Sequence, residues 1–282
     1  MNVLFDFDGV LFDSSWEVTV IIILTYMKAF PDSKISLHQS TLKTSEILRH
    51  LNRYDPNYAF RIVQKQNKKL NNCIKKLRTY CIDVDDFFIV SSLIDQNYPN
   101  LENLTYKVIN HKFYYSYKND LIQKRRRDLD LFIDSFYESR KYIKEANREF
   151  WLLLTPPYEN QIKFFTQICQ KHEVGILSTK QKYAILSILQ YYGINIDPNK
   201  VFAKENKFID KGKKIKEIMN LWAARDNELH FVDDLLENLL KVKSCLPNVS
   251  LYMASWGYNN YYHRLIAKKS GIKIIDTLAI FT

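Results

Sequence analysis

Apolar segments of strand length alternate with segments of helical periodicity through the second half of the chain. The strand candidates are "EVGILS" (173–178), "KVFAK" (200–204), "ELHFVDD" (228–234), "VSLYMA" (249–254) and "IKIID" (272–276). The segments between them repeat apolar residues three and four positions apart, as helices do. This alternation predicts an α/β fold, in which a parallel sheet is covered by helices on both faces.

One more strand candidate, "NVLFDF" (2–7), stands at the start of the chain. Residues 15–150 have a different hydrophobic pattern, with helical periodicity in stretches such as "SEILRHLNRY". The segment "DDFFIVSSLI" fits either a helix or a strand. An early strand followed by a distant α/β block indicates a discontinuous core. We therefore predict a core formed by residues 1–14 and 151–282, with residues 15–150 as a mainly α-helical insert.

The charge of the chain is uneven. The net charge is +10, and residues 15–150 hold 23 Lys and Arg against 16 Asp and Glu. A basic face attracts anions such as phosphorylated metabolites or nucleic acid. The tract "QKRRRD" (123–128) is open to two interpretations, a binding site for a polynucleotide or a solvent-facing helix surface.

The cysteines and the longest apolar run indicate in which cellular compartment the protein is expected. Cys73, Cys81, Cys169 and Cys245 form no CxxC pair, and the histidines show no metal-ligand spacing. This predicts reduced thiols in a cytoplasmic protein. The run "VTVIIILTYM" is far shorter than the roughly 20 residues that span a bilayer, so we expect a buried helix, no membrane partner and no signal peptide.

Polar side chains follow four of the strand candidates. They are Asp6 and Asp8, Ser178 and Thr179, the segment "DKGKK" (210–214), and Asp233 with Asp234. In open parallel sheets, ligands bind beyond the carboxyl ends of the strands. If these strands are neighbours, the acids converge to hold a divalent cation through oxygen ligands, and a hydroxyl and a lysine hold a phosphate.

The motif "DFDGVLFDS" (6–14) resembles the first motif of the haloacid dehalogenase-like superfamily, in its phosphatase branch. "GILST", "DKGKK" and "HFVDDLLEN" are similar to the second, lysine and acidic motifs of that family, in the same order. The resemblance implies a Rossmann-like three-layer α/β/α core and a Mg²⁺-dependent phosphatase acting on a small phosphorylated substrate. Residues 15–150 occupy the position of the family's helical cap.

The resemblance also implies roles for individual residues. Asp6 is the nucleophile that forms a phosphoaspartate, and Asp8 is the general acid and base. Ser178, with Thr179 as the competing hydroxyl, binds the phosphoryl oxygens. Gly9 is assigned to the same phosphate site and allows a tight backbone turn.

Further residues complete the implied site. Asp233 and Asp234 hold the magnesium ion together with Asp6 and the backbone carbonyl of Asp8. Lys211 pairs with the phosphate and with the nucleophile. The family usually has a proline after this lysine, and here Gly212 follows it, so four nearby lysines stay open as alternatives: Lys204, Lys207, Lys213 and Lys214.

Other interpretations also remain. The basic insert favours an alternative phosphatase that acts on nucleic-acid ends, and a non-catalytic binding or regulatory protein could keep the same fold. Dehalogenation is disfavoured, because a halide needs no proton from Asp8. Two local features have two interpretations each: Asp13 and Ser14 either cap the next helix or form a hinge, and "SWGYNN" (255–260) either reaches the site or forms a turn.

Overall fold

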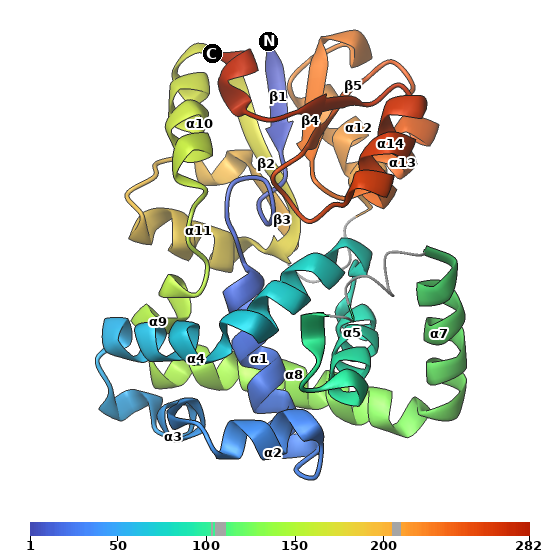
Figure 1. Ribbon diagram of the computed structural model, residues 1–282. Helices are drawn as coiled ribbons and strands as arrows, with labels where there is room; N and C mark the ends of the chain where they lie inside the picture. The colour runs from blue at the N-terminus through green and yellow to red at the C-terminus, as the bar shows by residue number, and fades with distance from the viewer. Residues whose placement is uncertain (103, 105–110, 205–209) are drawn as a thin grey trace. The chain divides into compact units, whose positions relative to one another are not determined.

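The structure is a computed structural model and describes residues 1–102, 104, 111–204 and 210–282 (Figure 1). The chain forms two compact units. One consists of Met1–Ser14 and Pro156–Thr282, and the other of Ser15–Thr155. The helical unit includes α9 (Arg148–Leu153), so the chain returns to the first unit after Thr155, whereas the sequence pattern predicted this return after residue 150.

In the described part of the first unit, six parallel strands form one sheet in the order β3-β2-β1-β4-β5-β6. The strands are β1 (Asn2–Phe5), β2 (Glu173–Gln181), β3 (Val201–Lys204), β4 (Leu229–Asp233), β5 (Ser250–Ala254) and β6 (Lys273–Ile275). The α/β prediction is confirmed. Because all pairings are parallel, the carboxyl ends of the strands lie at one edge of the sheet.

Helices cover the two faces of this sheet. They are α10 (Glu159–Lys171), α11 (Lys182–Tyr191), α12 (Lys211–Leu221), α13 (Leu236–Cys245) and α14 (Tyr261–Lys269). Successive strand residues point to opposite faces. Leu4 packs in a core cluster with residues of α12, α13 and α14, whereas the ring of Phe5 lies 5.5 Å from that of Phe165 on α10. Burial on both faces explains why β1 is continuously apolar.

The register of β1 brings its end close to the end of β4 and beside the middle of β2. Phe5 pairs with Ile176 of β2 on one side and with Val232 of β4 on the other. The Asp6 N–H continues this ladder by donating to the Val232 carbonyl at 2.8 Å. Asp6 and Asp233 therefore leave the sheet at the same level.

The second unit is helical in its described part. Its helices are α1 (Ser15–Ala29), α2 (Lys34–Ser40), α3 (Lys43–Arg49), α4 (Pro56–Leu77), α5 (Val84–Asn97), α7 (His111–Lys124), α8 (Arg126–Ala146) and α9. The ambiguous segment "DDFFIVSSLI" lies in α5. A capping box between Asp83 and Asp86 satisfies the first N–H groups of this helix, which favours the helical conformation. Across the described ranges, no helix is both long and apolar enough to cross a membrane.

The basic tract at the junction of α7 and α8 is extensively ion-paired. Three of its four cations pair with carboxylates within one helical turn: Lys124 with Asp120, Arg125 with Asp128, and Arg126 with Asp130. This pairing offsets much of the local positive charge and favours the solvent-facing interpretation of the tract. All four cysteines are free thiols, as predicted.

Candidate active site

Asp6 begins the loop after β1 and is buried, with 6% of its surface exposed. Its Oδ2 lies 2.9 Å from Lys211 Nζ, and its Oδ1 accepts the Phe7 N–H at 2.8 Å. Burial raises the pKa of Asp6 to about 6, with the Lys211 charge opposing the rise and Asp233 adding to it. The carboxylate therefore depends on positive charge close by to stay ionised.

Lys211 is the first residue of α12, whose first turn is capped by the Asp210 side chain accepting the Lys213 N–H. The Lys211 ammonium is buried and lies 2.6 Å from Asp233 Oδ2 as well as against Asp6. Burial alone would lower the pKa of Lys211, but the charges of Asp233 and Asp6 outweigh it and raise the pKa. The lysine is thus a permanent cation between two carboxylates.

The alternative lysines have other surroundings than Lys211, or lie outside the described residues. Lys213 is exposed, and Lys214 pairs with Glu217 at 2.6 Å. Lys204 ends β3 and is half-buried. Lys207 lies outside the residues that the structure describes. Of the described candidates, Lys211 is the one that the structure pairs with Asp6.

Asp233 ends β4, Asp234 follows it directly, and both are buried. Asp233 Oδ1 accepts the Leu235 N–H at 2.8 Å, and its Oδ2 accepts the Asn238 Nδ2–H at 3.1 Å. These bonds fix the rotamer of Asp233. One carboxylate oxygen from each of Asp6, Asp233 and Asp234 lies within 4.8 Å of the others, so the structure brings the predicted acids together.

Two glycines let the backbone approach Asp234 closely. Gly9 has φ +82°, and a Cβ there would lie 2.1 Å from Asp234 Oδ2. A Cβ at Gly257 would lie 2.3 Å from Asp234 Cβ and 2.5 Å from the Gly9 carbonyl oxygen. Gly9 therefore supports the acidic cluster by its conformation and lack of a side chain. Its assignment to phosphate binding stays a prediction.

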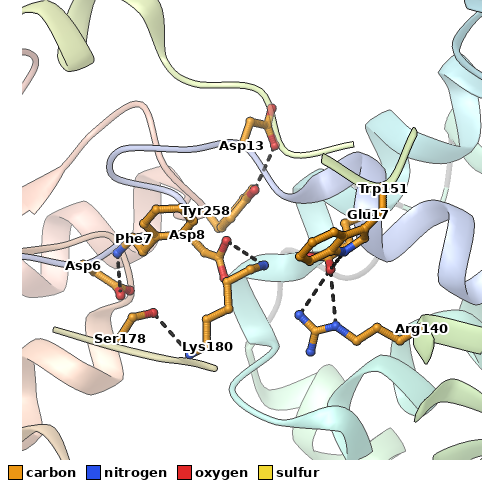
Figure 2. A network of polar contacts seen from close by, with 10 residues as sticks. All are labelled: Asp6, Phe7, Asp8, Asp13, Glu17, Arg140, Trp151, Ser178, Lys180 and Tyr258. Atoms are coloured by element: carbon orange, nitrogen blue, oxygen red, sulfur yellow. Dashed lines mark hydrogen bonds and ion pairs between the residues drawn. The ribbon is translucent and has the colours of Figure 1, made fainter. Parts of the chain in front are cut away.

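The segment "SWGYNN" (255–260) forms a turn after β5 and also contacts the acidic cluster, so both interpretations describe it in part. The Tyr258 N–H donates to Asp234 Oδ2 at 2.5 Å. The Tyr258 hydroxyl donates to Asp13 Oδ1 at 2.8 Å (Figure 2). The Trp256 Nε1–H donates to the Val10 carbonyl at 3.0 Å. This loop ties the loop after β1 to the end of β4.

At the end of β2, Ser178 is buried and Thr179 is exposed. The next residue, Lys180, was not among the sequence candidates. Its side chain is only 3% exposed, and its Nζ lies 3.4 Å from Asp8 Oδ1 (Figure 2). Ser178 and Lys180 are two residues apart on a strand, and this period of two was the signal that could have predicted Lys180.

The donor set of this cluster fits a divalent cation. Asp6, Asp233 and Asp234 bring three carboxyl groups, and Lys211 brings one ammonium group. With all of these groups ionised, the site has an excess of two negative charges in a largely buried setting. Carboxylate oxygens in such a set suit Mg²⁺, which takes a few protein oxygens and keeps further positions for substrate and water.

Comparison with known proteins finds similar structures but no matching sequence family or curated protein. No protein-family model matches the sequence, and no curated protein matches it. The fold is similar to that of a presumed phosphatase from Clostridium difficile, with a TM-score of 0.58 and 13% identity over 99% of this chain and 97% of that one. It is also similar to a haloacid dehalogenase-like family hydrolase from Streptococcus pneumoniae, with a TM-score of 0.56 and 10% identity over 98% of this chain and 94% of that one.

A third similar structure is a presumed haloacid dehalogenase-like hydrolase from Bacteroides fragilis, with a TM-score of 0.55 and 13% identity over 99% of this chain and 98% of that one. The likeness therefore covers nearly the whole of each chain. It agrees with the four motifs in the sequence and with the strand order of the sheet. The chain has the fold of the haloacid dehalogenase-like hydrolases.

Proposed function

We propose that the protein is a phosphatase that hydrolyses a small phosphate monoester through a phosphorylated Asp6. The observation that carries the proposal is the buried contact of Asp6 with Lys211, at 2.9 Å, beside Asp233 and Asp234. A carboxylate and a phosphate dianion repel each other. The fixed ammonium offsets this repulsion, and charge stabilisation of this kind usually contributes most of the rate enhancement in phosphoryl transfer.

The first half of the reaction joins Asp6 to phosphorus. An Asp6 carboxylate oxygen forms a bond to phosphorus while the bond from phosphorus to the ester oxygen breaks. The leaving oxygen takes the electron pair of that bond and the proton of the Asp8 carboxyl group. Ser178 donates a hydrogen bond to a phosphoryl oxygen, since its buried hydroxyl lies at the end of β2 beside the site.

The second half releases phosphate. The Asp8 carboxylate accepts a proton from water, whose oxygen forms a new bond to phosphorus as the bond to Asp6 breaks. Asp6 leaves as a carboxylate facing Lys211, and Asp8 is protonated again. Every proton and electron pair in the cycle is thus accounted for by two aspartates and one water molecule.

Asp6, Asp233, Asp234 and the backbone carbonyl of Asp8 would hold a magnesium ion in this proposal. When bound, the ion supplies positive charge to the phosphoryl oxygens and neutralises the acidic cluster. The Tyr258 N–H and the two glycines keep Asp234 in place for this role, because they fix its carboxylate and leave no room for it to turn away.

The helical unit takes the role of a cap in this proposal. This follows from its place in the chain, between the first and second motifs, where the family has its cap. A cap excludes bulk water during the reaction and shapes the substrate pocket. Action on nucleic-acid ends is less favoured, because the basic tract of this unit pairs with Asp120, Asp128 and Asp130.

A panel of small phosphate monoesters tests the proposal. We expect release of inorganic phosphate from at least one of them in the presence of Mg²⁺, and loss of this activity in the Asp6→Asn variant. Lys213→Met, at an exposed position of α12, serves as the control variant and should keep full activity. Activity that survives in Asp6→Asn would contradict the assignment of the nucleophile.

A further inference from the structure

Lys180 is a buried lysine whose ammonium group lies against Asp8. Among the described residues, Lys180 and Lys211 are the lysines that are buried. The Lys180 side chain extends from the end of β2 toward the Asp8 carboxylate, and the Nζ to Oδ1 distance is 3.4 Å (Figure 2). A lysine removed from water loses hydration free energy unless a carboxylate compensates it. The Asp8 carboxylate supplies such compensation here.

The two aspartates of the first motif have different cationic partners. Asp6 faces Lys211, which also contacts Asp233, whereas Asp8 faces Lys180. Both carboxylates belong to one short loop and repel each other. Separate lysines hold them in separate positions, so the attacking group and the proton donor are kept apart by charge as well as by sequence.

Lys180 is also the more buried member of its pair, with 3% of its side chain exposed against 19% for Asp8. It lies in a strand of the sheet, and its backbone N–H donates to Ser178 Oγ at 3.3 Å. Asp8 lies in the loop after β1. A group on a rigid strand can fix the orientation of a group on a loop.

We propose that Lys180 is a positioning residue for proton transfer by Asp8, an inference that rests on the proposed phosphatase function. When the ester bond breaks, the leaving oxygen takes the electron pair and the Asp8 proton, and negative charge develops on the Asp8 carboxyl group. The Lys180 ammonium faces that developing charge. A preorganised cation lowers the free energy of a transition state in which such charge forms.

Two substrates of nearly equal size separate this role from simple phosphate binding. Phenyl phosphate releases a basic oxygen that needs a proton, whereas 4-nitrophenyl phosphate releases a weakly basic oxygen that needs it much less. The value of kcat/KM reports the steps through loss of the leaving group. We expect Lys180→Met to lower kcat/KM for phenyl phosphate about tenfold more than for 4-nitrophenyl phosphate. Lys180→Arg keeps the cation, so we expect it to show a smaller difference between the two substrates than Lys180→Met does. It also serves as the test variant if Lys180→Met does not fold.

A double-mutant cycle with Asp8→Asn shows whether Lys180 acts through Asp8. We expect Asp8→Asn, like Lys180→Met, to lower kcat/KM more for phenyl phosphate than for 4-nitrophenyl phosphate. Once Asp8 has been replaced, Lys180→Met should lower kcat/KM for phenyl phosphate by less than about twofold. Lys200→Met is the control, because Lys200 pairs with Glu173 at 3.0 Å, away from Asp8. Lys200→Met should leave the ratio of the kcat/KM values for the two substrates unchanged.

Three results overturn the inference in distinguishable ways. An equal loss for both substrates in Lys180→Met would assign Lys180 to phosphate binding or to structure. Independent effects of Lys180→Met and Asp8→Asn would remove the link to Asp8. If the wild-type protein with Mg²⁺ releases phosphate from neither ester nor from any other monoester, the proposed function fails and the inference fails with it.

Discussion

The Nζ atom of Lys211 lies 2.9 Å from the Oδ2 atom of Asp6, with both side chains buried. The same ammonium lies 2.6 Å from Asp233, so one lysine joins the end of β1 to the end of β4. This contact links the fold to the chemistry. It holds Asp6, the proposed nucleophile, beside the acidic cluster and would supply positive charge where a phosphate meets Asp6.

Replacing Lys211 is therefore expected to affect the reaction strongly. We expect Lys211→Met to lower kcat for phosphate release by about 10²-fold or more, because a fixed charge in a transition state is worth about that factor. Steady-state kinetics with Mg²⁺ measure this loss. Lys214→Met is the matched control on the same helix, since Lys214 pairs with Glu217 and should have little influence on kcat. Similar kinetics for the two variants would contradict the role of Lys211.

The raised pKa of Asp6 predicts how the stability of the metal-free protein depends on pH. Because burial raises this pKa from 3.8 to about 6, the folded protein binds the Asp6 proton more tightly than the unfolded chain does. The contribution is complete below pH 3.8 and is lost as the pH rises through about 6. The free energy of unfolding should thus fall by up to about 3 kcal/mol over this range.

Urea unfolding in the presence of a chelator measures this effect. The informative quantity is the difference in free energy of unfolding between the wild type and Asp6→Asn. The variant lacks the Asp6 carboxyl group but keeps every other titrating group. We expect this difference to favour the wild type more at pH 4 than at pH 6.5. A difference that is constant with pH would mean that burial does not raise the pKa of Asp6.

Gly257 is expected to be essential for metal binding. A Cβ at this position would lie 2.3 Å from Asp234 Cβ and 2.5 Å from the Gly9 carbonyl oxygen, and neither neighbour can easily move. Gly257→Ala should displace Asp234 and weaken the binding of Mg²⁺ by about tenfold or more, as changes to groups that support metal ligands do. The stabilisation that Mg²⁺ gives against thermal unfolding measures the affinity.

Gly212→Ala is the matched control for this variant. Gly212 lies next to Lys211, but a Cβ there would lie 3.4 Å from its nearest neighbour, which is ordinary contact. Alanine also favours a helix over glycine by about 1 kcal/mol. We expect unchanged Mg²⁺ affinity in Gly212→Ala. Equal weakening in both variants would show that the effect is not specific to the contact of Gly257 with Asp234.

In the helical unit, two ion pairs join α1 to α8 and differ in burial. Glu17 is buried and accepts hydrogen bonds from Arg140 Nη2 at 3.2 Å and from Trp151 Nε1 at 3.0 Å (Figure 2). Lys28 pairs with Glu138 at the surface. We expect Glu17→Gln to lower the free energy of unfolding by about 2 kcal/mol, because Arg140 loses a buried partner.

The exposed pair provides the comparison for Glu17. We expect Glu138→Gln to change the free energy of unfolding by less than about 0.5 kcal/mol, since solvent screens exposed pairs. Equilibrium unfolding in urea gives both values. If the two substitutions had equal effects, burial would not be what makes the Glu17 contact important.

The sequence predicted the class of fold and which residues of the candidate site lie close together. Alternating strands and helices predicted the parallel sheet, and the motifs predicted that Asp6, Lys211, Asp233 and Asp234 come together, as they do. Lys180 was missed because burial, and not residue type, distinguishes it from the many other lysines of the chain. Burial follows from tertiary packing, and the local pattern offers only the two-residue spacing of Lys180 from Ser178 as a signal.

The loop 255–260 was ambiguous for a related reason. Its residues favour a turn, and a turn alone does not determine which neighbour it contacts. Only the strand order, with β4 beside β5, brings Tyr258 onto Asp234. In the same way, the segment "DDFFIVSSLI" has apolar residues that suit either a helix or a strand, and the capping box at Asp83 is the local feature that favours the helix.

Chemical trapping of the phosphorylated residue tests the central claim most directly. The protein would be mixed with Mg²⁺ and an excess of a phosphate monoester that it hydrolyses, quenched in acid and reduced with borohydride, which converts an aspartyl phosphate to homoserine. Peptide mass spectrometry then locates the reduced residue. We predict homoserine at position 6, dependent on substrate. Phosphate release without any modification of Asp6, or with modification at another aspartate, would contradict the proposed mechanism.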